Sequence, residues 1–153
     1  MDIRELVRKE VIEGNGYQQE LSPVKIKLDA NEFPYSLTRD MEKELADLLE
    51  KMAFNRYPDP QAAKIREIAA RSLGVEPEMV MFGNGSDELI QILLIALAGG
   101  KPKAVVPVPT FTMYEISASF LGYQVSRVPL DADFDLDVPA ILHAAKRGQP
   151  KVL

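Results

Sequence analysis

The sequence predicts an α/β fold with a largely parallel sheet, and three features of its pattern indicate this. An apolar run, 79–82, leads through a glycine turn into an apolar helix that ends near Gly99. A second apolar run, 104–106, lacks polar alternation, as parallel strands covered on both faces do. Strand and helix patterns then keep alternating along the chain, which is typical of α/β folds.

The first part of the chain is predicted to contain an extended arm, one strand and three helices. The expected segments are a helix over 2–13, the arm over 17–23, a half-buried strand over 24–28, a helix over 38–52, and a helix that starts at Asp59-Pro60 and stops at Gly74. The helix over 38–52 carries an apolar stripe that is expected to be core: Met41, Leu45, Leu48, Leu49 and Met52.

The second part of the chain continues the alternation. After the strand at 104–106, a helix with Met113, Ile116, Phe120 and Leu121 is expected to end at Gly122. A strand follows over 123–130, then a helix capped by Asp137 that ends at Gly148, and 151–153 resembles the opening of another strand. Because an unfinished parallel sheet exposes an edge, we expect these residues to be the front part of a longer, truncated architecture.

The segment 79–89 is predicted to form an anion site. Gly83 and Gly85 permit positive φ and close approach, Ser86 is a suitable N-cap, and Asp87 and Glu88 suit a first helical turn. Unpaired N–H groups at such a helix start attract phosphate. The alternative is an ordinary strand-to-helix turn, since two carboxylates repel an anion and neither the GxGxxG nor the Walker pattern is present.

Composition excludes several classes of protein. The 153 residues are 46% apolar and 27% charged, which indicates a globular chain with a core. A net charge of −5 argues against nucleic-acid binding, and the absence of cysteine with a single histidine, His143, argues against a thiolate or histidine metal site. No signal peptide and no apolar run near the ~20 residues of a membrane span is present, so a cytoplasmic protein is expected.

Four segments, in this order and spacing, resemble histidinol-phosphate aminotransferases. They are KLDANEFP at 27–34, NRYPD at 55–59, GNGSDE at 83–88 and PTFTMY at 109–114. That family is a branch of the fold-type I enzymes that use pyridoxal 5'-phosphate (PLP). The resemblance implies an N-terminal arm and small-domain segment over 1–35, and the first part of the PLP-binding large domain, a mostly parallel sheet with flanking helices, over 36–153.

The resemblance also implies roles for particular residues. Gly85, Ser86 and Asp87 would hold the cofactor phosphate through backbone N–H groups at the helix start. Phe111 would stack on the pyridine ring, where many relatives carry tyrosine. Tyr57 would reach across a homodimer interface to the phosphate of the partner's cofactor. Three further residues would contact the amino-acid or phosphate substrate: Asn31, Glu32 and Tyr17.

Each of these residues also has an ordinary structural interpretation. Phe111 follows a strand and could be core, because aromatic residues there usually pack inside. Tyr57 lies in a proline-rich loop, where a tyrosine more often anchors the loop. Asn31 and Glu32 precede Phe33-Pro34 in a common turn pattern. The four-segment resemblance favours the functional interpretation most for Ser86, Asp87 and Phe111.

In this family the Schiff-base lysine and the partners of the pyridine ring lie downstream of the part that 1–153 matches. None of the ten lysines here has the family's local context, so no catalytic residue is assigned and the chain alone is expected to be inactive. The complete protein is expected to transfer an amino group between L-histidinol phosphate and 2-oxoglutarate. Two alternatives remain open: a related aminotransferase for aromatic amino acids, and a non-catalytic phosphate-binding or dimerisation fragment.

Overall fold

The computed structural model describes residues 2–14, 16–17, 23, 25–28 and 30–148. The chain divides into two compact units, one made of Met1–Gln19 with Phe82–Leu153 and the other of Glu20–Met81. These units do not follow the domain limits at 35 and 36 that the resemblance implies, and those limits stay a prediction for the complete protein. Each unit is described below by itself.

The described residues of the unit 20–81 form two helices and one 3₁₀ turn. They are α2 (Arg39–Leu49), α3 (Ala63–Leu73) and η2 (Pro77–Met79). Thr38 caps α2 as its hydroxyl accepts the Met41 N–H at 3.4 Å, and Gly74 ends α3 at φ +69°. The Arg66 guanidinium donates two hydrogen bonds, of 2.8 and 3.2 Å, to the Pro77 carbonyl and so ties α3 to η2.

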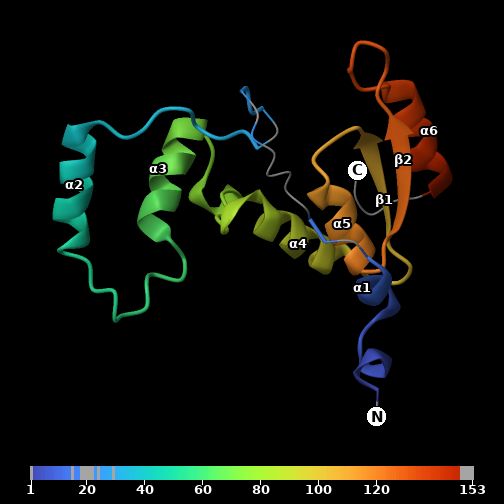
Figure 1. Ribbon diagram of the computed structural model, residues 1–153, viewed down its shortest axis with the longest axis horizontal. Coiled ribbons are helices and arrows are strands. Elements are labelled where there is room, and N and C mark those ends of the chain that lie inside the picture. Colours follow the sequence, from blue (N-terminus) through green and yellow to red (C-terminus); the bar gives the residue numbers. More distant parts are fainter. Residues whose placement is uncertain (1, 15, 18–22, 24, 29, 149–153) are drawn as a thin grey trace. The chain divides into compact units, whose positions relative to one another are not determined.

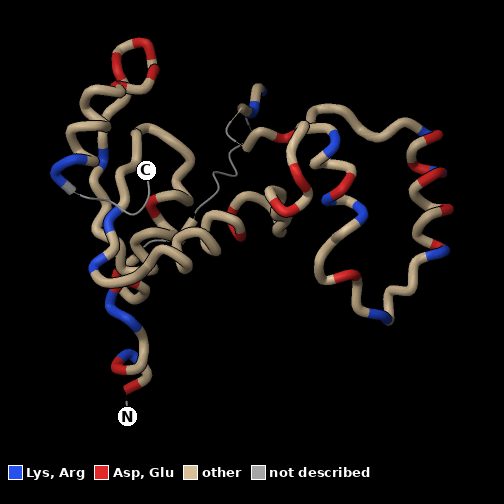
Figure 2. Tube along the Cα trace, turned by 180° about the vertical axis from the view of Figure 1, so that it is seen from behind, with Lys and Arg blue, Asp and Glu red and all other residues tan. Residues whose placement is uncertain are grey.

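The apolar stripe of α2 is not core in this chain, contrary to expectation. All five of these side chains are about half exposed, and Figure 2 shows the charged residues that accompany them along α2. The pattern is amphipathic, but an amphipathic helix buries its stripe only if another element lies against it. Within the described part of this unit, no element covers the stripe.

The described residues of the other unit form a two-stranded parallel sheet with helices around it (Figure 1). Its elements are η1 (Ile3–Leu6), α1 (Lys9–Glu13), α4 (Gly85–Leu97), β1 (Lys103–Val108), α5 (Met113–Phe120), β2 (Gln124–Pro129) and α6 (Val138–Gly148). β1 pairs with β2 from Lys103–Gln124 to Val108–Pro129, and the crossover between them is α5. The expected strand–helix–strand–helix order from 104 to 148 is confirmed.

Both faces of β1 are covered. Ala104, Val105 and Val106 are consecutive and all buried, and consecutive strand residues point to opposite faces. Ala104 and Val106 belong to the core cluster with Leu94 of α4 and Ala118 of α5. Val105 therefore points to the other face, where α6 packs on the strands.

Glycine and aspartate residues end and start elements where the sequence predicts. Gly122 follows α5 at φ +78°, and the Asp137 carboxylate accepts the Ala140 N–H at 3.0 Å as the cap of α6. Gly14, which follows α1, lies so close to the Phe120 ring that an added Cβ would overlap it. The C-terminal end of α1 thus packs on the end of α5.

Several expected boundaries are wrong. The helix over 2–13 is split into η1 and α1, because Arg8 takes an extended conformation with ψ 141° between them. The helix over 38–52 ends at Leu49, and α3 begins at Ala63 instead of Pro60. Asp59 still caps the turn before α3, since its carboxylate accepts the N–H groups of Gln61 and Ala63 at 3.0 and 2.8 Å.

Two expected strands are not formed in the part of the chain that the structure describes. Residues 25 and 26 form a bend, 27 and 28 have no regular structure, and Val24 lies outside the described residues. Met79 belongs to η2, and 80–82 are irregular although Val80 is locally extended at φ −111°, ψ 126°. A strand needs a hydrogen-bonded neighbour, and no described segment pairs with either run. The predicted strand opening at 151–153, and most of the arm over 17–23, lie outside the described residues.

Candidate functional site

The turn that leads into α4 contains two glycines, Gly83 and Gly85, and each is required for a different physical reason. Gly85 has φ +77°, which a residue with a side chain adopts only with strain, and no atom lies near an added Cβ. Gly83 has no positive φ, but a Cβ there would lie 2.9 Å from both Glu88 Oε2 and Leu89 Cδ2. The expectation of positive φ is therefore confirmed for Gly85 and wrong for Gly83, which permits close approach instead.

The two acidic residues of the first turn, Asp87 and Glu88, have different environments. Glu88 Oε2 accepts the Asn84 backbone N–H at 2.5 Å, so this carboxylate closes the turn on itself. Asp87 Oδ1 is buried and has no hydrogen-bond partner among the described residues. The hydrogen bond from Asn84 thus offsets part of the negative charge of Glu88, whereas no described group offsets that of Asp87 Oδ1.

The backbone donors of this turn remain available. Ser86 is the second residue of α4 and not its N-cap; Asn84 stands at the cap position, and its side chain makes no capping bond. The Gly85 N–H donates to the Gly83 carbonyl at 2.9 Å. Within the described residues no acceptor takes the N–H groups of Ser86 and Asp87, and Ser86 is exposed. Two free donors at a helix N-terminus suit an anion.

Phe111 lies in a group of three aromatic side chains. Its ring centroid is 5.9 Å from that of Tyr114, with an angle of 89° between the rings, and 6.4 Å from that of Tyr17, with an angle of 65°. The side chain is 41% exposed, so Phe111 is not core. Both pairs are T-shaped, a favourable arrangement for aromatic rings, and neither neighbour stacks parallel on Phe111.

The structure brings Tyr17 to the same unit as Gly85, Ser86, Asp87 and Phe111. Sequence reasoning gave Tyr114 no role, although its position three residues after Phe111 is the spacing at which helical side chains meet. The remaining candidate residues belong to the unit of 20–81. Asn31 has φ +49°, Glu32 forms an ion pair with Lys27 at 3.6 Å, and Tyr57 is fully exposed.

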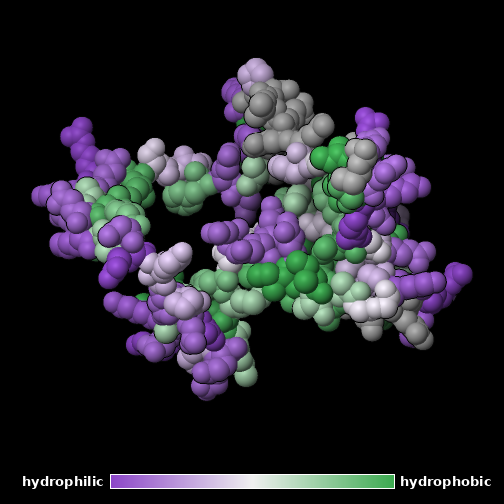
Figure 3. Space-filling model, turned by 90° about the horizontal axis from the view of Figure 1, so that it is seen from below, coloured by the Kyte–Doolittle hydropathy of each residue, from purple (hydrophilic) through white to green (hydrophobic). Residues whose placement is uncertain are grey.

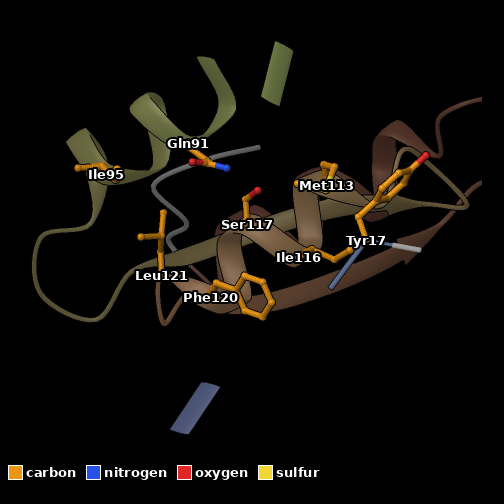
Figure 4. Close-up of a pocket in the computed structure, with 8 residues that line it drawn as sticks. All are labelled: Tyr17, Gln91, Ile95, Met113, Ile116, Ser117, Phe120 and Leu121. Atoms are coloured by element: carbon orange, nitrogen blue, oxygen red, sulfur yellow. The ribbon is translucent and has the colours of Figure 1, made fainter. Parts of the chain in front are cut away.

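A cavity of about 250 Å³ lies between α4, α5 and the arm (Figure 4). Its wall is mainly apolar, and the Ser117 hydroxyl, buried on α5, has no hydrogen-bond partner among the described residues. Gln91 of α4 and Tyr17 add polar groups. The Gln91 side chain interrupts the apolar run of α4 in the sequence, which is the one signal that could have indicated this cavity.

The described residues hold no group of three metal-ligating side chains. No helix among them is long and apolar enough to cross a membrane. His143 is exposed on α6, as its mixed surroundings in the sequence predict.

Fold and site together define an α/β protein with a free helix N-terminus at a glycine turn and a half-exposed aromatic residue after the next strand. A family model for aminotransferase class I and II matches residues 23–153. The chain belongs to this family, which confirms the resemblance and the fold class that the four segments indicate.

Similar proteins carry one recurring name. A histidinol-phosphate aminotransferase of Aquifex aeolicus is 37% identical over 145 residues, which are 95% of this chain and 41% of that protein. One from Desulfitobacterium hafniense is 41% identical over 157 residues, covering 99% of this chain and 42% of that protein. The chain therefore spans about two fifths of the length of the curated relatives it matches.

Solved structures share the fold. Histidinol-phosphate aminotransferase from Sinorhizobium meliloti, in complex with pyridoxal-5'-phosphate, superposes with a TM-score of 0.70 at 20% identity, covering 79% of this chain and 32% of that one. L-threonine-O-3-phosphate decarboxylase from Porphyromonas gingivalis gives 0.53 at 23% identity, covering 67% and 32%. At these identities the likeness concerns the fold alone.

Proposed function

We propose that the complete protein is a PLP-dependent aminotransferase that acts on L-histidinol phosphate and 2-oxoglutarate, in the cytoplasm and as a homodimer. The observation that carries this proposal is the identity of 35–41% to histidinol-phosphate aminotransferases along nearly the whole chain. PLP, when bound, supplies the electron sink that amino-group transfer requires. The residues of this chain supply binding and orientation.

The start of α4 fits the phosphate of such a cofactor. The free N–H groups of Ser86 and Asp87 offer two hydrogen bonds, and the dipole of α4 favours a negative charge there. Gly85 has no side chain to stand between the phosphate and this turn, and open space surrounds it. Glu88 is drawn back to Asn84 by its hydrogen bond, so its charge is partly offset.

Phe111 fits the role of a stacking residue, because its ring is half-exposed and meets its aromatic neighbours only in T-shaped pairs. Tyr17, whose ring forms a T-shaped pair with Phe111, is proposed to limit access of water and to meet the substrate. Asn31 and Glu32 are proposed to lie at the substrate end of the site. Tyr57, whose side chain is fully exposed, is proposed to donate its hydroxyl to the cofactor phosphate of the partner subunit.

A titration with PLP followed by borohydride reduction and peptide mapping tests this proposal. In the complete protein we expect one reduced lysine, outside residues 1–153, and transamination of L-histidinol phosphate with 2-oxoglutarate. In residues 1–153 alone we expect no stoichiometrically reduced lysine and no turnover. A single labelled lysine within 1–153 would contradict the assignment.

Comparison of amino donors on the complete protein tests the substrate. We expect L-histidinol phosphate to be used more efficiently than phenylalanine or tyrosine. A preference for the aromatic amino acids would retain the PLP chemistry and replace the proposed substrate. A complete protein that binds PLP no better than residues 1–153 would favour a non-catalytic binding role.

A further inference from the structure

One hydrogen bond joins the C-terminal part of α4 to the residue before β2. The Tyr123 hydroxyl donates to the Leu94 carbonyl at 2.6 Å, and both residues are buried. In a continuing helix the Ala98 N–H would take this carbonyl, but here it donates to the Ile95 carbonyl at 3.3 Å. The Leu94 carbonyl is therefore one of the open acceptors of the helix end, and Tyr123 satisfies it from 29 residues away.

The packing of α4 against the rest of its unit is otherwise apolar. Leu94 lies in the cluster with Ala104, Val106 and Ala118, and Ile90 and Ala98 pack at its margin. Leu93 and Ile95 of the same helix remain exposed, and Figure 3 shows apolar surface gathered on the face of the molecule that it displays. Apolar contact is non-directional, whereas a hydrogen bond restricts both distance and angle. The Tyr123 bond therefore fixes the position of α4 along its axis more closely than the packing does.

We propose that Tyr123 is a positioning residue for the phosphate-binding turn at the other end of α4. Ser86 precedes Leu94 by eight residues, which is about 12 Å along the helix axis. A helix held by its internal hydrogen bonds moves largely as one body, so a shift at Leu94 displaces the N–H groups of Ser86 and Asp87. This inference rests on the proposed function, because it assumes that these groups bind the phosphate of PLP.

Tyr123→Phe in the complete protein tests the proposal, with PLP and pyridoxal as probes of the apoenzyme. The two compounds share the ring and differ in the phosphate, so the ratio of their affinities reports on the phosphate-binding turn. The substitution keeps the buried ring and removes one oxygen atom, so the protein is expected to fold. We expect PLP to bind about three- to tenfold more weakly, the range that the loss of one hydrogen bond allows, with pyridoxal unchanged.

Two matched variants separate positioning from general loss of stability. Tyr35→Phe makes the same chemical change at an exposed side chain of the other unit and should leave the ratio unchanged. Val128→Ala removes buried volume from β2 outside the cluster of Leu94, so it should lower the unfolding midpoint without lowering the ratio. If Tyr123→Phe lowers only the unfolding midpoint, as Val128→Ala does, Tyr123 is a stabilising residue and the proposal is wrong.

The unmodified protein provides the separate test of the proposed function. If it binds PLP no more tightly than pyridoxal, the start of α4 is not a phosphate site, and both proposals fail together. If it prefers PLP and Tyr123→Phe retains that preference in full, the proposed function stands and the role of Tyr123 is refuted.

Discussion

Asp59 illustrates how a single side chain organises a connection in this chain. The hydrogen bond from the Ala63 N–H, then that from the Gln61 N–H and the charge of Arg66, hold the pKa of Asp59 below its ordinary value of 3.8. The bonds favour the ionised carboxylate, which is the better acceptor. This one side chain therefore makes the turn into α3 sensitive to acid.

The sign of the pH dependence follows from the lowered pKa. Because the folded form of Asp59 binds its proton less readily than the unfolded form, its contribution to stability is full above about pH 4 and is lost as the pH falls through the folded pKa. We predict that Asp59→Ala lowers the unfolding midpoint at pH 7, and that the difference from the unmodified protein shrinks below pH 3.8. Urea unfolding of both proteins between pH 7 and 3 measures this. A difference that stays constant over that range would contradict the assigned cause.

The two glycines of the α4 turn are required for different physical reasons. Gly85 is required by backbone conformation, and Gly83 by the approach of Glu88 and Leu89. The sequence presents both as equal parts of one motif. Only the backbone angles and the neighbouring atoms reveal that an alanine would be strained in place of Gly85 and crowded in place of Gly83.

At the scale of elements, α4 is apolar around much of its circumference. Such a helix is usually buried on several sides, yet in this chain Leu94 is 4% exposed and its neighbour Leu93 is 52% exposed. Both leucines line an open groove along β1 with Tyr114 and Ile141, but Leu94 also packs into the core cluster with β1 and α5. The two leucines therefore differ in how much of the side chain the protein covers.

We predict that Leu94→Ala lowers the free energy of unfolding of residues 1–153 by about 2–5 kcal/mol, because it removes buried volume and leaves a cavity. Leu93→Ala should cost much less in the same chain, since its side chain is already in contact with solvent. Chemical denaturation of the two variants provides the comparison. Equal costs in residues 1–153 would mean that the outer face of α4 is covered there. A larger cost of Leu93→Ala in the complete protein would mean that this groove is filled only in the longer chain.

At the scale of the whole molecule, the candidate residues are distributed over both compact units. Gly85, Ser86, Asp87 and Phe111 lie in one unit and Tyr57 in the other. The proposal assigns Tyr57 to the site of the partner subunit, and this assignment makes a prediction that does not depend on any distance within one chain.

Mixed dimers of the complete protein test it. Tyr57→Phe and Phe111→Leu should each weaken PLP binding, the first by loss of a hydrogen bond and the second by loss of ring stacking. If Tyr57 serves the neighbouring site, a dimer formed from one subunit of each kind holds one intact site and one doubly substituted site. Titration of separately tagged, purified mixed dimers should then reveal a class of sites with unmodified affinity. If Tyr57 acts within its own subunit, every site keeps one defect and no such class appears.

The sequence alone determined those features that depend on local chemistry. Hydrophobic runs predicted β1, β2 and the helix between them. Gly74 and Gly122 predicted helix ends, and Asp59 and Asp137 predicted caps, because each of these features depends on residues within a few positions. The four segments likewise indicated the family, since their residues, order and spacing can be read from the sequence without a structure. Boundaries shifted by up to three residues at α2 and α3, where the intrinsic preference for helix is shared by several neighbouring residues.

Only the tertiary structure decided which surfaces are buried and which donors are free. The stripe of α2 and the runs 25–28 and 79–82 have the composition of core helix and strands, but burial and pairing require a second element that no described segment provides. Within the described residues, the N–H groups of Ser86 and Asp87 are free because of the backbone angles of the turn. The contact of Phe111 with Tyr17 and the hydrogen bond from Tyr123 to Leu94 join residues that are distant in sequence. Local pattern fixes what a segment prefers, and contact between segments decides which of those preferences are satisfied.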